Sequence, residues 1–98
     1  MIIYTTASRD ELEKINMKIL VNVHVPAISK KYDMLIPETL SVETVTQLIA
    51  RSVEELSNHL YVSSKEETLC RTEQRIILQP NFTLEQYGVE NGEHLMLL

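Results

Sequence analysis

The single cysteine and the three histidines are the residues of this chain best suited to nucleophilic or metal chemistry. Cys70 would act as a nucleophile only if a nearby histidine, cation or helix N-terminus lowered the pKa of its thiol. His24, His59 and His94 lie far apart and lack the short spacing to a cysteine or carboxylate that a metal site requires. We therefore interpret Cys70 as a small packed side chain and expect no metal and no cofactor.

The glutamates form small groups, at Glu54-Glu55, at Glu66-Glu67 and between Glu90 and Glu93. Two carboxylates in one cleft can divide the work of a general acid and a general base. A small domain offers little concave surface in which a substrate could lie between them. We interpret these glutamates as solvated charges, so the sequence predicts no catalytic residue and no enzyme.

The charge balance excludes several classes of partner. The 98 residues include 9 Lys and Arg against 14 Asp and Glu, a formal net charge of −5, and Lys30-Lys31 is the one adjacent basic pair. Nucleic-acid binding depends on clustered cations that neutralise phosphates, so we expect none. No apolar run approaches the roughly 20 residues that span a bilayer, so we expect no membrane insertion. A lone cysteine cannot form an internal disulfide, which favours the cytoplasm.

Residues 17–25 alternate between apolar and polar side chains, which predicts a strand with one buried face. The apolar members are Met17, Ile19, Val21, Val23 and Val25. Residues 31–36 alternate in the same way and predict a second strand. Its inward members are Tyr32, Met34 and Ile36. The short connection predicts that the two strands form an antiparallel hairpin.

Residues 42 to about 60 carry the clearest helical pattern. Apolar side chains recur there at spacings of three and four and form one stripe. Its members are Val42, Val45, Ile49, Val53, Leu56 and Leu60. Ser41 is a suitable N-cap, and Glu43 lies in the first turn, where the helix dipole favours a negative charge. This segment therefore predicts a long amphipathic helix.

The last third of the sequence predicts three short strands and one turn. Residues 68–72 and 75–79 have the composition of strands, and residues 83–89 have the length of a single helical turn that Gly88 ends. Residues 94–98 predict the final strand. Its alternation places Leu95 and Leu97 inward and Met96 and Leu98 outward.

The expected order is strand, strand, helix, strand, strand, short helical turn, strand. A mixed, curved sheet around one amphipathic helix buries the apolar faces of both in two layers, so we predict an α+β fold over residues 17–98. Residues 1–16 form an N-terminal extension, in which Ser8 and Glu11 have the spacing of a capping box. Two interpretations of it stay open: a short helix, or translation from a start codon placed too early, since Met17 opens the next element.

This order of elements resembles ubiquitin and its relatives, which have the β-grasp fold. The likeness runs from the opening strand at Met17–Val21, through Pro37 and the capped helix, to Thr83–Val89 and Leu95–Leu97. It covers residues 17–98 and implies that the predicted sheet and helix form a β-grasp.

A closer resemblance is to the YukD/EsaB family, small bacterial ubiquitin-like proteins that accompany type VII secretion systems. Tyr32-Asp33, Pro37 and Leu40 carry it ahead of Leu48-Ile49, together with the run from Leu84 to the end of the sequence. These positions belong to the core and to turns, and none is catalytic. The resemblance implies a cytoplasmic adaptor or regulator that docks on a protein component of the secretion machinery, at the cytosolic side of its membrane complex.

The C-terminal residues bear on covalent attachment. Conjugated ubiquitin relatives and sulfur carriers activate the carboxylate of a terminal glycine on a slim tail, where no Cβ obstructs the activating enzyme. Here the sequence ends with Leu95–Leu98 in a predicted strand, and its two glycines are Gly88 and Gly92. We therefore expect a non-conjugated protein that works by binding, and a carrier or an enzyme is the less favoured alternative.

The outward face of the sheet is the candidate binding surface. Apolar side chains beside polar neighbours on a solvent-facing sheet are typical of a contact patch, and ubiquitin relatives commonly bind through this face. The predicted members are Leu20, Asn22, Leu35, Cys70, Met96 and Leu98. Single exposed apolar residues are also normal on proteins, so a second hypothesis stays open. In that hypothesis residues 2–4 add an edge strand to a neighbouring copy and form a homo-oligomer.

Overall fold

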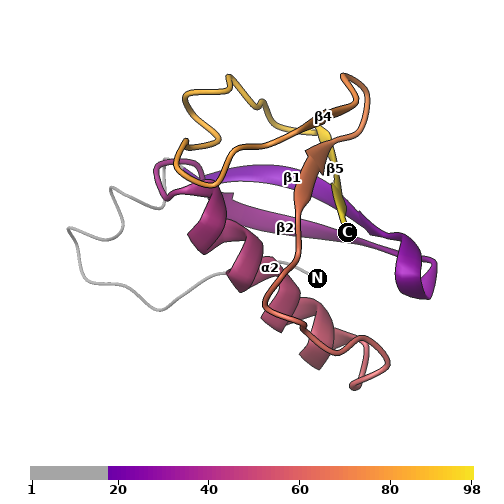
Figure 1. Ribbon diagram of the computed structural model, residues 1–98. Coiled ribbons are helices and arrows are strands. Elements are labelled where there is room, and N and C mark those ends of the chain that lie inside the picture. Colours follow the sequence, from indigo (N-terminus) through magenta and orange to yellow (C-terminus); the bar gives the residue numbers. More distant parts are fainter. Residues whose placement is uncertain (1–17) are drawn as a thin grey trace, which may run out of the picture.

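A computed structural model describes residues 18–98 as one sheet of five strands with one α-helix against it (Figure 1). The elements are β1 (Lys18–Val25), β2 (Lys30–Pro37), α2 (Val42–Leu56), β3 (Leu69–Arg71), β4 (Ile76–Ile77) and β5 (His94–Leu97). The strand order is β2-β1-β5-β3-β4, with β1 and β5 parallel and the other neighbours antiparallel. The predicted mixed sheet and helix are confirmed. The predicted N-terminal extension, its Ser8 cap and Met17 lie outside the described residues.

The β1–β2 hairpin follows the predicted alternation. Its inward side chains are buried and belong to the core, apart from Tyr32, which is half-buried. A 3₁₀ turn at Pro26–Ile28 joins the strands, and Ser29 closes it with a left-handed φ of 52°. Because Pro26 lacks a backbone N–H and sets φ near the value a helical turn needs, it both ends β1 and begins this turn.

The helix begins as predicted. Ser41 is extended, and its hydroxyl accepts a hydrogen bond from the backbone N–H of Thr44 at 3.2 Å. This bond satisfies one of the donors that every helix N-terminus leaves free. The buried stripe of α2 packs on the inward face of the sheet, and the two together make up the core. No helix within residues 18–98 is long and apolar enough to cross a membrane.

The helix ends at Leu56, and the predicted end near residue 60 is wrong. Asn58 takes a left-handed φ of 55°, and the backbone N–H groups of Asn58 and His59 donate to carbonyls of the last turn at 3.0 and 2.8 Å. This pattern of two backward hydrogen bonds terminates many helices, and asparagine is one of the few residues that tolerate its left-handed position. Leu60, expected in the buried stripe, is therefore 64% exposed.

The strands β3 and β4 form, but they are shorter than the predicted ranges 68–72 and 75–79. The chain reverses between them at Arg75, which has a left-handed φ of 57°. After two paired residues Leu78 leaves the strand and enters the core, while its N–H still donates to the carbonyl of Leu69 at 2.9 Å. Leu78 therefore packs in the core, although strand propensity alone assigns it to the sheet.

The turn predicted at residues 83–89 is present. Its start is a capping box, because Gln86 N–H donates to the Thr83 hydroxyl at 3.0 Å and Thr83 N–H donates to the Gln86 side-chain carbonyl oxygen at 2.9 Å. Its end is Gly88, at a φ of 68° that favours glycine. As expected, Leu84 and Val89 are buried, and Tyr87 is half-buried.

Candidate protein-binding face

Strand pairing decides which side chains share the face of the sheet away from α2, which we call the outer face. Leu20 is paired with Leu35 across β1 and β2, and both point away from the core. Leu20 is 38% exposed and Leu35 is half-buried. The turn at Asn91-Gly92 anchors this end of β1, since Asn91 Oδ1 accepts from Leu20 N–H at 2.8 Å and Gly92 N–H donates to the Leu20 carbonyl at 2.7 Å.

The next row across the outer face is polar. Asn22 is paired with Asp33 on one side and with His94 on the other. The Asn22 side-chain amide donates to Asp33 Oδ1 at 3.0 Å. Two residues advance a strand by roughly 7 Å, so this row separates Leu20 and its partner from the apolar residues beyond it. The structure therefore does not bring the six predicted members into one continuous apolar patch.

The third row forms the main apolar group. Met96 lies at its centre, paired with His24 on β1 and with Cys70 on β3. Ile77 on β4 pairs with Cys70 and is 61% exposed, and Leu98, two residues after Met96, is 58% exposed. Leu98 is tied to the sheet, because its backbone exchanges two hydrogen bonds of 2.9 Å with that of Thr68. Three predicted members thus come together here.

A shallow hollow of about 440 Å³ lies beside this apolar group. Its lining includes Cys70, Thr72, Arg75, Ile77 and Met96. The sequence prediction missed Ile77 and Arg75. A signal for Ile77 was present: if Leu78 faces the core, alternation turns residue 77 outward and places it beside the cysteine on the neighbouring strand. No local signal pointed to Arg75, which lies in the turn before β4.

Burial raises the pKa of the Cys70 thiol. Because the thiolate is the reactive form, this shift is opposite to the one a nucleophilic cysteine needs. The thiol acts at neutral pH as a small apolar group in the row beside Met96. Within residues 18–98 no three His, Cys, Asp or Glu side chains come close enough to hold a metal ion.

An ion pair on the inner side fixes the end of β3 against β5. Arg71 donates from Nε and Nη2 to the two carboxylate oxygens of Glu93 at 2.9 and 2.6 Å, and from Nη1 to the Tyr87 carbonyl at 3.0 Å. The hydrogen bonds from Arg71 hold the pKa of Glu93 below its ordinary value, and those same bonds raise the pKa of Arg71. The Tyr87 hydroxyl accepts from Gln79 N–H at 2.8 Å, so the clamp also reaches the segment after β4.

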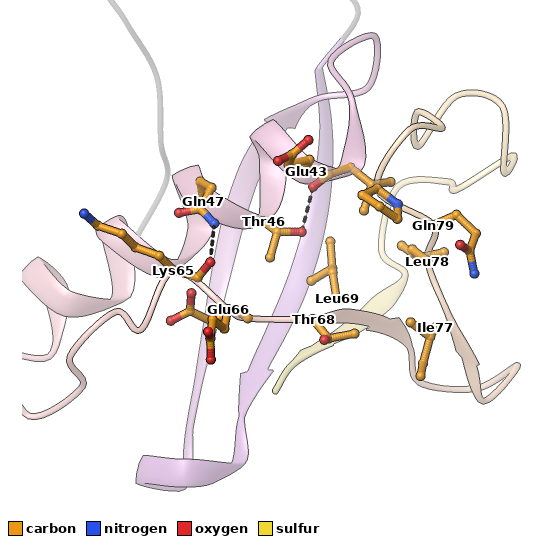
Figure 2. Close-up of a pocket in the computed structure, with 13 residues that line it drawn as sticks. Glu43, Thr46, Gln47, Lys65, Glu66, Thr68, Leu69, Ile77, Leu78 and Gln79 are labelled. Carbon is orange, nitrogen blue, oxygen red and sulfur yellow. Dashed lines mark hydrogen bonds between the residues drawn. The ribbon is translucent and has the colours of Figure 1, made fainter.

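A second hollow, of about 340 Å³, lies between the first half of α2 and the loops that flank β3 and β4 (Figure 2). Its presence corrects the expectation that so small a domain offers little concave surface. Figure 2 shows Glu43 and Glu66 well apart at its edge, and the Gln47 amide donates to the Lys65 carbonyl at 3.3 Å. Glu43 and Glu66 therefore do not form the close pair that acid–base catalysis uses.

Glu67, at the same hollow, already accepts hydrogen bonds from neighbouring residues. Its carboxylate accepts from the Tyr61 hydroxyl at 2.8 Å and from Ser64 N–H at 2.7 Å. Burial alone would raise the pKa of Glu67, but these hydrogen bonds bring the pKa below its ordinary value. Burial, followed by the Glu67 carboxylate, raises the pKa of Tyr61 to about 12. This cluster closes the loop after α2, which is a structural role.

Comparison with known proteins identifies the kind of fold and family that these elements belong to. The family model described as WXG100 protein secretion system (Wss), protein YukD, matches residues 20–97. No curated protein matches the chain.

Several solved structures share the fold. The ubiquitin-like domain of the Mycobacterium tuberculosis type VII secretion system protein ECCD1 has a TM-score of 0.66 at 16% identity, covering 83% of this chain and 97% of that one. A chain of the MycP5-free ESX-5 inner membrane complex has a TM-score of 0.63 at 15% identity, covering 84% of this chain and 21% of that one. The ubiquitin-like domain of Arabidopsis thaliana protein At2g32350 has a TM-score of 0.62 at 23% identity, covering 83% and 76%. The ubiquitin-like β-grasp fold is therefore confirmed.

Proposed function

The chain belongs to the YukD family of the WXG100 protein secretion system, and from this membership we propose that it is a non-conjugated adaptor that binds a protein component of such a system. The observation that carries the proposal is the apolar group on the outer face. Met96 and Cys70 are half-buried and Ile77 is exposed, on strands whose opposite side is held by the core, and exposed Leu98 directly follows β5. Exposed apolar side chains on a rigid support are typical of protein-binding sites.

The similar structures support a proposal for where the partner lies. One is a ubiquitin-like domain of a type VII secretion protein, and another is a chain of an inner membrane complex. By analogy of fold and family, the partner of this chain is a component of the secretion machinery at the cytosolic side of the membrane. The protein itself is then cytoplasmic and peripheral to the membrane complex.

The chemistry of the described residues supports binding rather than catalysis. The raised pKa of the Cys70 thiol disfavours a nucleophile, and the Glu67 carboxylate is occupied by loop hydrogen bonds. Residues 95–97 lie in β5, and the backbone of Leu98 is hydrogen-bonded to that of Thr68. The outer-face side chains of Met96 and Leu98 therefore stand on a fixed backbone, which suits a binding role.

Site-specific photo-crosslinking in the native cell tests the proposal. A photoreactive residue at position 77 is compared in the otherwise unchanged protein, in a Met96→Asp and Leu98→Asp double variant, and in a Leu60→Asp and Val62→Asp control. The control residues are exposed apolar side chains in the loop after α2. We expect capture of a secretion subunit that the outer-face variant loses and the control retains. Equal capture by the two variants, with both folded by circular dichroism, would show that this face is not the binding site.

Self-association is the second candidate. The observation that favours it is β2, an edge strand of eight residues with one side not paired to any other strand within residues 18–98. Open edges accept further strands, and residues 2–4 have a suitable apolar composition. Sedimentation of the full chain and of residues 17–98 separates the candidates. A dimer that is lost on deletion supports self-association, and a monomer in both cases refutes it.

A further inference from the structure

The hollow beside Met96 has a lining that differs from one side to the other. Cys70, Ile77 and Met96 contribute an apolar wall from three adjacent strands. Arg75, in the turn between β3 and β4, contributes an exposed cation at the other side. A site of this form suits a group that is apolar at one end and carries negative charge at the other.

The outer face carries positive charge although the chain as a whole is negative. Lys18 and Lys31 extend outward from the strands, and Asp33 is the one carboxylate among the outward strand positions described. The charge of Asp33 is already partly satisfied by the amide of Asn22 at 3.0 Å. The full chain has a net charge of −5, and the other described carboxylates lie on α2 and in the loops, among them the exposed Glu73 in the turn that carries Arg75.

None of the outer-face cations is neutralised by the described part of the protein. Within residues 18–98 the ion pair present is that between Arg71 and Glu93, on the inner side of the sheet. Lys31 and Arg75 are exposed. A partner that approaches Met96 therefore meets two unpaired cations, Lys31 in the same row of the sheet and Arg75 at the hollow. Electrostatic complementarity favours partners with carboxylates there.

The conformation of Arg75 offers a substitution that removes its charge without adding backbone strain. Its φ of 57° lies in the left-handed region, where a side chain costs about 1–2 kcal/mol relative to glycine. Glycine would relieve this strain but would leave the hollow without its cation.

From these observations, and resting on the adaptor role proposed above, we infer that the hollow formed by Cys70, Arg75, Ile77 and Met96 binds an acidic segment of the partner protein. An apolar side chain of that segment contacts Met96 and Ile77, and a neighbouring carboxylate contacts the Arg75 guanidinium. An anionic membrane is a poorer match, because lipid surfaces are bound by clusters of four to eight Lys and Arg, whereas Lys18, Lys31 and Arg75 are dispersed.

Three synthetic peptides of equal length probe the hollow on the full chain. One combines Leu with Glu, one combines Leu with Lys, and one combines Ser with Glu. Backbone amide shifts in NMR titrations report where each binds and how tightly. We expect the Leu/Glu peptide to shift the amides of Cys70, Arg75, Ile77 and Met96 and to bind more tightly than the other two. Raising the salt concentration weakens its binding, because exposed charges are screened.

Variants of Arg75 separate charge from folding. Arg75→Glu lowers the affinity for the Leu/Glu peptide by roughly three- to tenfold, as reversal of an exposed ion pair does. Arg75→Gly also weakens binding, but it leaves stability unchanged or higher because it relieves the left-handed strain. Arg51→Glu, the same charge reversal at an exposed position on α2, is the matched control and leaves the affinity unchanged.

Several results would overturn the inference. Equal or tighter binding of the Leu/Lys peptide, or unchanged affinity in Arg75→Glu, refutes an acidic partner. Shifts of the same amides by phosphatidylglycerol vesicles, without shifts by any peptide, assign the face to a membrane. No shift with any probe refutes the hollow as a site. Each of these leaves the crosslinking result at position 77 intact, so failure of the inference is distinguishable from failure of the adaptor role.

Discussion

The ion pair between Arg71 and Glu93 is the interaction whose removal has the most specific predicted consequence. It joins the end of β3 to the residue before β5, and so supports the two central strands of the outer face. The side chains of Arg71 and Glu93 are 13% and 21% exposed, and the arginine makes three hydrogen bonds of 2.6–3.0 Å. The pair is therefore well shielded, unlike an ordinary surface ion pair.

The expected magnitude follows from this geometry. Arg71→Met removes all three hydrogen bonds, leaves the Glu93 carboxylate partly buried without its cation and leaves the Tyr87 carbonyl without this donor. We expect a loss of about 2–4 kcal/mol in the free energy of unfolding, since charged hydrogen bonds contribute about 1.5–3 kcal/mol and an abandoned charge adds its desolvation cost. Each kcal/mol corresponds to about 4–8 °C in Tm for a domain of this size.

A double-mutant cycle isolates the pair itself. Urea unfolding of the native chain, Arg71→Met, Glu93→Gln and the double variant is followed by circular dichroism. At neutral pH we expect a coupling energy of about 1–2 kcal/mol, because the partial exposure of the two side chains makes their interaction weaker than that of a fully buried ion pair.

The coupling has a definite pH dependence. The pKa of Glu93 is lower in the folded protein than in the unfolded chain, so its contribution is complete above the unfolded pKa of about 4.3 and is lost as the pH falls through the folded value. In acid the difference in stability between the native chain and Arg71→Met should therefore shrink to the part that comes from the hydrogen bond to the Tyr87 carbonyl. A coupling energy near zero at neutral pH, or one that survives protonation of the carboxylate, would refute the reasoning.

Three further predictions follow from local geometry. Ser41→Ala removes the cap that accepts from the first turn of α2 and should cost about 1 kcal/mol in a urea titration, whereas Ser41→Asp should retain most of the stability. Tyr61 has a pKa of about 12 in the native chain, and Glu67→Gln removes the charge beside its hydroxyl, so the pKa of Tyr61 should be lower in this variant. The pKa is measured from tyrosinate absorbance, with Tyr61→Phe to identify the signal of Tyr61. An unchanged pKa would mean that the Glu67 carboxylate does not contribute to the shift. The Cys70 thiol, whose pKa is raised by burial, should react with iodoacetamide more slowly in the folded chain than in urea, and equal rates would show that the fold neither shields the thiol nor raises its pKa.

Much of the fold was accessible from the sequence because the relevant signals are local. The alternation of residues 19–25 and the helical stripe beginning at Val42 reflect the geometry of a strand and a helix, which each segment expresses without its neighbours. Ser41 and Gly88 mark a helix start and a turn end for the same reason. Their predicted roles are confirmed.

The predictions that failed depend on competition between local propensity and the rest of the chain. The apolar spacing extends to Leu60, but a left-handed Asn58 stops the helix at Leu56 and exposes that side chain. The sequence has the composition of a strand as far as residue 79, but Leu78 packs in the core and β4 contains two residues. The periodicity of a segment does not show whether its apolar side chains bury more surface by continuing the helix or strand or by leaving it.

The sequence alone determined that one face of each strand is apolar, that the helix begins after Ser41, and that Met96 and Leu98 point away from the core. It left the neighbours of these side chains undetermined. Cys70 lies beside Met96 because β3 pairs with β5, and Arg75 reaches the same hollow because the chain reverses into β4. The pairing of β3 with β5 joins residues more than twenty positions apart. The proposed binding surface is thus a product of long-range strand order, which is decided by burial of the shared core and not by any local pattern.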